Sequence, residues 1–152
     1  MQGWILKVRP SNPVHAQVIR RLTRLLHEVL DHRIDVSVQL PFAASDDSQP
    51  EPDIAVIPIG DYLDDHPSRA HLIVEVADSS LRAGCQSKAQ IYAEAGVGDY
   101  WIVNRVDDLI EVYREPTAEG YGSVTSFRRG QRIALLDFPD TIIAVDDILP
   151  PG

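Results

Sequence analysis

The sequence lacks the features that mark membrane-spanning and disulfide-stabilised proteins. It has one cysteine, Cys85, so no disulfide can form within the chain, and this fits a reducing compartment. There is no run of about 18 apolar residues, so no membrane span is expected. Residues 1–4 include neither a basic region nor a long apolar stretch, so no secretory signal is expected. We therefore predict a cytoplasmic protein.

An excess of positive charge is also missing. The chain has 23 acidic and 14 basic side chains and a net charge of -9, the opposite of what most nucleic-acid-binding proteins show. The arginines are nevertheless grouped, at positions 20, 21 and 24 and again at 128, 129 and 132. These groups are read either as solvated faces that keep the protein soluble or as contacts for an anionic partner, and bound divalent cations would offset acidic charge at a site.

What the sequence does contain is the pattern of one α/β domain. Its 152 residues and 44% hydrophobic content suit a single domain with a substantial core. An apolar stripe of helical spacing predicts a helix that is capped at Ser11 or Asn12, has Pro13 in its first turn and runs to about residue 31. Alternating and apolar runs predict strands at 4–8, 34–40, 53–57, 72–76, 100–103, 109–114, 121–127, 132–136 and 141–145. We expect a mixed, largely antiparallel sheet flanked by two long helices.

Two of these strands contain a carboxylate in an apolar setting. Asp53 begins one β-branched run, and Glu75 lies inside another. Period-2 alternation places Glu75 on one face with Ile73 and Ala77. An uncompensated charge in a strand buried on both faces would cost several kcal/mol or more, so something must compensate both carboxylates.

The second long helix contains a lysine where an apolar residue is expected. The segment 85–95 predicts a helix that Gly96 ends in a left-handed conformation. Lys88 shares a stripe with Ile91, Tyr92 and Ala95, and Tyr92 is expected to pack against the lysine. Misplaced charges in three consecutive buried elements suggest one site, because each is tolerable only beside the others or beside a cation. A buried ion pair between Glu75 and Lys88, with Asp53 as a turn residue, explains the pattern equally well.

The order of Asp53, a strand, Glu75 with an apolar residue after it, and then Lys88 resembles the PD-(D/E)xK nuclease superfamily. It is most similar to the branch in which the lysine lies on the following helix, the restriction-endonuclease-like family called Uma-two. The resemblance covers about residues 10–150. It is carried by residues 10–15, 49–53, 73–76, 79–80, 88, 92, 95–97 and 100–103.

The resemblance implies a single restriction-endonuclease-like domain over residues 1–152 and a magnesium-dependent endonuclease that hydrolyses phosphodiester bonds in DNA. It implies that Asp53, Glu75 and the backbone carbonyl of Val76 bind Mg²⁺ or Mn²⁺, an ion that prefers oxygen ligands. Lys88 would orient or deprotonate the attacking water and contact the phosphate. Asp53, Glu75 and Lys88 are thus the predicted catalytic residues, DNA is the predicted partner, and a homodimer is a predicted assembly.

Two departures from the family pattern motivate a rival hypothesis. We expect the chain to lack a helix and a strand that usually precede the first strand, together with an acidic residue that faces the metal. Gly84 stands where the family commonly has an aspartate. The rival is a catalytically inactive remnant that serves as a binding or assembly module. A nuclease acting on RNA or on a branched structure is a third hypothesis.

Two further polar residues are ambiguous in the sequence. His15 lies at the edge of the first helix stripe and is read as a structural histidine or as a contact for phosphate or metal. Gln39 precedes the site and is read as an edge residue or as part of the site. Glu51 and Asp78 flank the two carboxylates and are expected to be turn residues.

Overall fold

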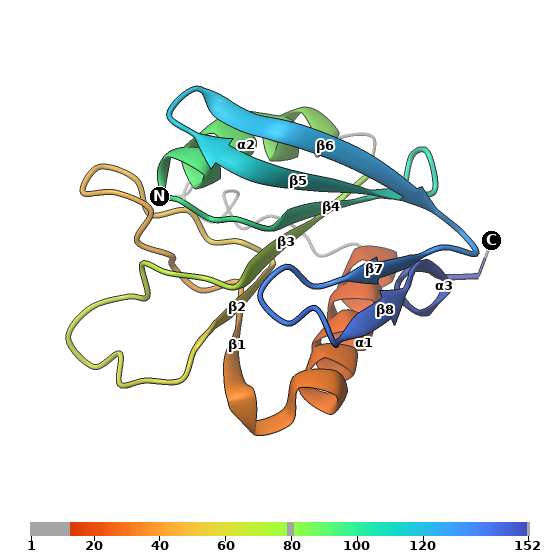
Figure 1. Ribbon diagram of the computed structural model, residues 1–152, viewed down its shortest axis with the longest axis horizontal. Helices are drawn as coiled ribbons and strands as arrows, with labels where there is room; N and C mark the ends of the chain where they lie inside the picture. The colour runs from red at the N-terminus through yellow and green to blue at the C-terminus, as the bar shows by residue number, and fades with distance from the viewer. Residues whose placement is uncertain (1–12, 79–80, 152) are drawn as a thin grey trace, which may run out of the picture.

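A six-stranded sheet forms the centre of the computed structural model, which describes residues 13–78 and 81–151 (Figure 1). The strands lie in the order in which they occur in the chain, and only β3 and β4 are parallel to each other. The sheet is therefore mixed and largely antiparallel, as predicted. Its strands are β1 Ile34–Val38, β2 Ile54–Pro58, β3 Leu72–Ala77, β4 Tyr100–Asn104, β5 Leu109–Thr117 and β6 Gly120–Arg128.

Helices cover both faces of this sheet. Helix α1, Pro13–Leu30, lies on one face, and α2, Arg82–Glu94, lies on the other and provides the crossover between β3 and β4 (Figure 1). The alternation of β3 follows from this arrangement: Val74 and Val76 pack in the core on the α1 side, whereas Ile73 packs in the core on the α2 side. Every residue of β3 is buried, which explains its unbroken apolar sequence around Glu75.

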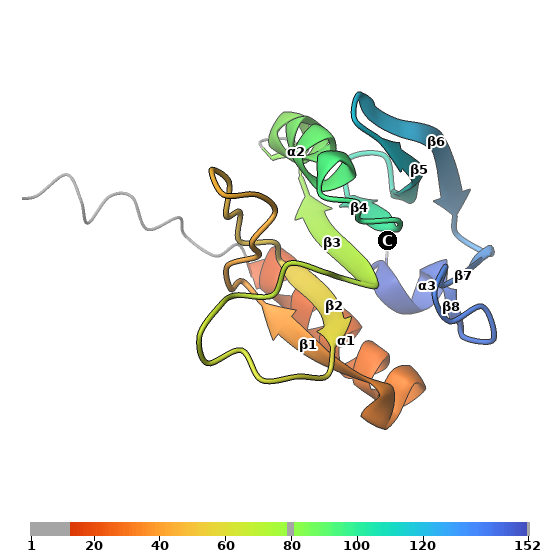
Figure 2. The same cartoon turned by 60° about the vertical axis from the view of Figure 1, so that its left-hand side comes forward.

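A smaller unit continues the core on the α1 side. It comprises β7 Arg132–Ala134, β8 Ile142–Ala144 and the short helix α3 Val145–Ile148, which the sequence pattern did not predict (Figure 2). Asp99 attaches this unit to the large sheet, because its buried carboxylate accepts hydrogen bonds from Arg114, from Trp101 and from the backbone N–H of Leu136. The guanidinium of Arg114 also donates to the carbonyl of Ala134 at 2.7 Å.

Several predicted boundaries move. β1 ends at Val38 rather than at residue 40, because Gln39 adopts a left-handed φ of 53°. α2 begins at Arg82 rather than at 85, and it ends before Gly96, whose φ of 81° confirms the predicted left-handed cap. In α1, Val14 is 39% exposed, whereas His15, which was placed at the edge of the predicted apolar stripe, is buried.

Some predictions fall on residues that the structure does not describe. The strand at 4–8 and the capping residues Ser11 and Asn12 lie outside the described residues, as do Ser79 and Ser80. Within residues 13–78 and 81–151, no helix has the length and apolar character that crossing a bilayer requires.

Candidate functional site

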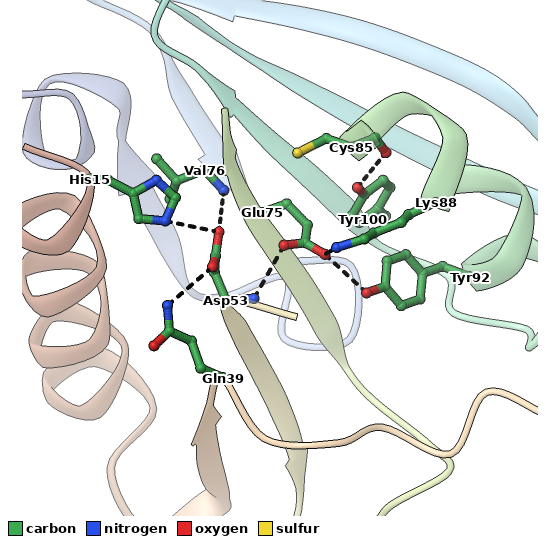
Figure 3. A network of polar contacts seen from close by, with 9 residues as sticks. All are labelled: His15, Gln39, Asp53, Glu75, Val76, Cys85, Lys88, Tyr92 and Tyr100. Carbon is green, nitrogen blue, oxygen red and sulfur yellow. Dashed lines mark hydrogen bonds and ion pairs between the residues drawn. The ribbon is translucent and has the colours of Figure 1, made fainter. Parts of the chain in front are cut away.

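The register of β2 and β3 brings the two carboxylates together. Ile54 pairs with Val74, so Asp53 and Glu75 stand opposite each other one position beyond the paired residues. Both residues are almost fully buried, at 3% exposure. Residues separated by 22 positions in the chain thus meet where β2 begins and β3 approaches its end (Figure 3).

Donors from α1, from β3 and from the residue after β1 surround the carboxylate of Asp53 (Figure 3). Its Oδ2 accepts a hydrogen bond from the backbone N–H of Val76 at 2.8 Å and lies 3.5 Å from Nε2 of His15 on α1. Its Oδ1 accepts a hydrogen bond from Nε2 of Gln39, at 3.5 Å. His15 and Gln39 therefore contact Asp53 directly, which the sequence had left open for both. Its place at the edge of an apolar helix stripe was the only sequence signal for the histidine.

Glu75 is held from the opposite side of the sheet by α2. Its Oε2 accepts hydrogen bonds from the ammonium of Lys88 at 3.3 Å and from the hydroxyl of Tyr92 at 3.0 Å. Its Oε1 accepts one from the backbone N–H of Asp53 at 3.2 Å. The sequence had assigned Tyr92 only to packing against the lysine, and it carried no signal that the hydroxyl would reach Glu75.

The backbone of Val76 also faces this site. Ile73 donates to Asp99 and Ala77 accepts from Arg105, so these odd-numbered residues of β3 bond toward β4. Val76 alternates with them and directs its N–H and carbonyl toward Asp53. Continuing the register by two residues beyond the Ile54–Val74 pair would place Pro52 opposite Val76, and proline has no N–H to donate to that carbonyl. Val76 lines the pocket, so its carbonyl is a candidate oxygen ligand.

The two carboxylates differ in how their surroundings change their acidity. Burial raises the pKa of Asp53, but hydrogen bonds from His15 and Val76 outweigh it, and the pKa ends below its usual value. Burial and the neighbouring charge of Asp53 raise the pKa of Glu75, despite the opposing effect of Lys88. Burial and the charge of Glu75 also raise the pKa of the Tyr92 hydroxyl, which therefore stays protonated and donates. The site holds two acids of unlike strength in contact.

A pocket of about 180 Å³ opens beside these groups. It is lined by Asp53, Glu75, Val76, Leu81, Gly84, Cys85 and Lys88. Gly84 is exposed and has no atom within 4 Å of the place where a Cβ would stand, so there is room for a side chain at this side of the pocket. The side chain of Lys88 is 34% exposed, so the ammonium can reach both Glu75 and solvent.

The structure thus brings the predicted residues together, and one of them, Lys88, is more exposed than predicted. Asp53, Glu75, Val76 and Lys88 line one pocket, while the exposed Glu51 does not line it. The prediction that Lys88 occupies a core position was wrong, because the buried stripe of α2 is formed by Cys85, Ala89 and Tyr92, and Lys88 lies at its edge. The catalytic and metal-binding roles of these residues stay predictions.

The side chains alone do not form a full metal cage. Among residues 13–78 and 81–151, no three or more His, Cys, Asp or Glu side chains form a group that could hold a metal ion. Two carboxylates and one backbone carbonyl nevertheless suit a hard cation that keeps several of its waters.

The chain matches a known family by its sequence and a solved structure by its fold. Residues 1–146 match the model of the Uma2 family, described as "Putative restriction endonuclease". A search of curated proteins found no match. Among solved structures, the chain is similar to a protein from Anabaena variabilis described as "a putative nuclease belonging to DUF820". The TM-score is 0.73 at 14% sequence identity, and the alignment covers 91% of this chain and 81% of that one. This likeness shows a nuclease-like fold.

Proposed function

The chain belongs to the Uma2 family of restriction-endonuclease-like proteins, and from this premise we propose that it is a Mg²⁺- or Mn²⁺-dependent endonuclease that hydrolyses phosphodiester bonds in DNA. The observation that carries the proposal is the convergence of Asp53, Glu75 and Lys88 on one pocket, from two strands and a helix. An ion pair that served only stability would need neither the pocket nor a second carboxylate in contact with the first.

The residues at the pocket fit a magnesium ion. Mg²⁺ takes oxygen ligands and is commonly held by one or two carboxylates, water and substrate phosphate. Asp53 and Glu75 would supply the carboxylates, and the carbonyl of Val76, opposite a proline, would supply the third protein oxygen. When bound, the cation would polarise the phosphate and lower the pKa of a water ligand. Because the protein offers so few oxygen ligands, we expect it to bind a single ion.

The remaining residues would hold and orient the reacting groups. His15 and the N–H of Val76 both bind Oδ2 of Asp53, which directs the other oxygen of this carboxylate away from them. The ammonium of Lys88 lies at the edge of the pocket, where it would contact a phosphate oxygen or hold the attacking water. The deeply buried carboxylates would thus bind the cation, and the half-exposed lysine would meet the substrate.

Cleavage of supercoiled plasmid DNA tests the proposal. The protein is incubated with plasmid in Mg²⁺, in Mn²⁺ and in EDTA, and nicked and linear products are followed by gel electrophoresis. We expect products with either cation and none in EDTA. Single-stranded RNA and a branched DNA junction, assayed in parallel, identify the substrate class. Absence of cleavage together with absence of cation binding in calorimetry would instead establish the inactive remnant. The lack of a carboxylate at Gly84 favours that alternative.

Lys88→Met is expected to lower the cleavage rate about 100-fold, the usual range for loss of a group that moves or positions a proton. The same variant should bind Mn²⁺ several-fold more tightly, because Glu75 loses the ammonium that competes with the cation for it. Calorimetry measures the affinity and the plasmid assay the rate. Equal cleavage by wild type and variant, purified in the same way, would point to a contaminating nuclease.

Gly84→Asp is expected to raise the affinity for Mn²⁺ about tenfold, or about 1.4 kcal/mol. A carboxylate at this position would extend into the open space of the pocket without a clash and would add negative charge near Glu75. Gly84→Asn is the matched control, because it has the same size without the charge. Both variants should be at least as thermally stable as the wild type, since glycine weakens a helix. An equal gain in affinity in both would exclude the charge as the cause.

Homodimer formation also stays a prediction. Light scattering of the purified protein at several concentrations would measure its mass.

A further inference from the structure

Tyr92 is hydrogen-bonded to the site through its hydroxyl group. Its ring is fully buried in the core between the sheet and α2, where it packs edge-on against Phe42 and in tilted contact with Tyr100. Its hydroxyl reaches out of this core and donates to Oε2 of Glu75 at 3.0 Å (Figure 3). The bond is shorter than the 3.3 Å between the same oxygen and the ammonium of Lys88.

We propose that Tyr92 is a positioning residue, whose hydroxyl holds Glu75 in place so that Lys88 is free to leave it for the substrate. The inference rests on the proposed function, because it concerns the reaction in which Glu75 and Lys88 would take part. It follows from the sharing of one carboxylate oxygen between two donors of unlike mobility.

The two donors differ in burial and in freedom to move. Tyr92 is fully buried and its ring is fixed by neighbouring rings, whereas the side chain of Lys88 is 34% exposed at the rim of the pocket. If Lys88 alone satisfied Oε2, movement of the ammonium to a phosphate would leave a buried carboxylate oxygen without that donor, which is costly. With Tyr92 present, Oε2 keeps a hydrogen-bond donor when Lys88 moves to the phosphate, and Oε1 stays directed toward the N–H of Asp53.

The fixed orientation matters for cation binding. Oε1 of Glu75 accepts the N–H of Asp53 and so remains beside the second carboxylate. Hydrogen bonds that orient a metal-binding carboxylate typically change metal affinity 10- to 100-fold when they are removed. Loss of the Tyr92 hydroxyl should therefore weaken binding of the cation, although the hydroxyl does not line the pocket.

The chain offers a matched control in Tyr100. This residue is also fully buried, its ring centroid lies 4.9 Å from that of Tyr92, and its hydroxyl donates to the backbone carbonyl of Cys85 at 2.7 Å. Tyr92→Phe and Tyr100→Phe each remove one oxygen and one buried hydrogen bond while the packed ring remains. They differ in the partner of the lost bond, a site carboxylate in one case and the backbone of α2 in the other.

The experiment compares wild type, Tyr92→Phe and Tyr100→Phe in the full chain. Calorimetry with Mn²⁺ measures affinity, and thermal melting without cation measures stability. We expect Tyr92→Phe to bind Mn²⁺ at least about tenfold more weakly. Tyr100→Phe should lower the melting temperature by a similar or larger amount and keep the wild-type affinity.

The outcomes separate this inference from the proposed function. If wild type binds Mn²⁺ and Tyr92→Phe binds it equally well, or both variants lose affinity alike, Tyr92 has only a structural role and the inference is overturned while the proposed function stands. If wild type binds no Mn²⁺ and cleaves nothing, the proposed function falls, and the positioning role falls with it. Selective loss of affinity in Tyr92→Phe supports both.

Discussion

Asp53→Asn is expected to reduce cation-dependent cleavage at least about 1,000-fold, since a ligand that stabilises charge in the transition state contributes several kcal/mol. Asparagine keeps the shape of the side chain, and its oxygen can still accept the hydrogen bond of the Val76 N–H. It lacks the negative charge that attracts a hard cation. The expected result is a folded protein that neither binds Mn²⁺ tightly nor nicks plasmid DNA.

The matched control is Asp46→Asn, the same replacement in an exposed part of the loop before β2. Circular dichroism and thermal melting establish that both variants are folded. Plasmid nicking and calorimetry with Mn²⁺ then compare them with wild type. Cleavage by Asp53→Asn at the rate of Asp46→Asn would exclude Asp53 from the reaction and would refute the proposed site.

Glu75→Gln is expected to abolish cleavage and, in the absence of cations, to raise the free energy of unfolding by about 1 to 2 kcal/mol. Burial and the adjacent charge of Asp53 raise the pKa of Glu75, so its ionised form destabilises the fold at neutral pH. The amide of glutamine removes this charge, and its oxygen can still accept from the N–H of Asp53. Its NH₂ then replaces Oε2, so the Tyr92 hydroxyl accepts from it and the half-exposed Lys88 ammonium turns to solvent. A gain in stability on substitution is expected of a charged group that serves function at a cost in stability. Removal of one partner from a stabilising buried ion pair would instead lower stability.

The stability difference should depend on pH in a defined direction. A carboxyl whose pKa is higher in the folded than in the unfolded state binds more protons when folded, so stability falls as pH rises above the unfolded pKa. At pH values below the usual pKa of 4.5, wild-type Glu75 is protonated and resembles glutamine. The variant should therefore melt close to wild type in acid, and its advantage should grow as pH rises above that value and level off above the raised pKa of the folded state.

Thermal or urea unfolding from pH 4 to pH 7, in EDTA, measures this difference. Glu51→Gln is the control, because Glu51 is exposed beside the site. Its stability should follow that of wild type across the range. A Glu75→Gln variant less stable than wild type at pH 7 would establish the alternative that the sequence left open, a structural ion pair between Glu75 and Lys88.

Much of the fold could be predicted because it depends on local patterns. The apolar run of β3 predicts a strand buried on both faces, and Gly96 predicts the end of α2 because its φ of 81° is easily reached only without a Cβ. Boundaries were less accurate where one backbone conformation decides them, as at Gln39. The short helix α3 was missed because four residues carry too little periodicity to be recognised.

The sequence predicted which residues form the candidate site, but only some of the contacts between them. Asp53, Glu75 and Lys88 stand out in the sequence because charge is rare in buried segments. Tyr92 does not stand out, since a tyrosine on an apolar stripe has the pattern of an ordinary core residue. Whether its hydroxyl reaches Glu75 depends on how α2 lies on the sheet, which no local pattern encodes.

The sequence by itself determined that the carboxylates of Asp53 and Glu75 must find partners, since burying an unpaired charge is too costly, and its motif determined the family. Only the tertiary structure decided which partners they find. The register of β2 against β3 places Asp53 opposite Glu75, and the rotation of α2 buries Tyr92 while leaving Lys88 half-exposed at the pocket. Register and rotation are set by the packing of the whole core, which involves residues far apart in the chain.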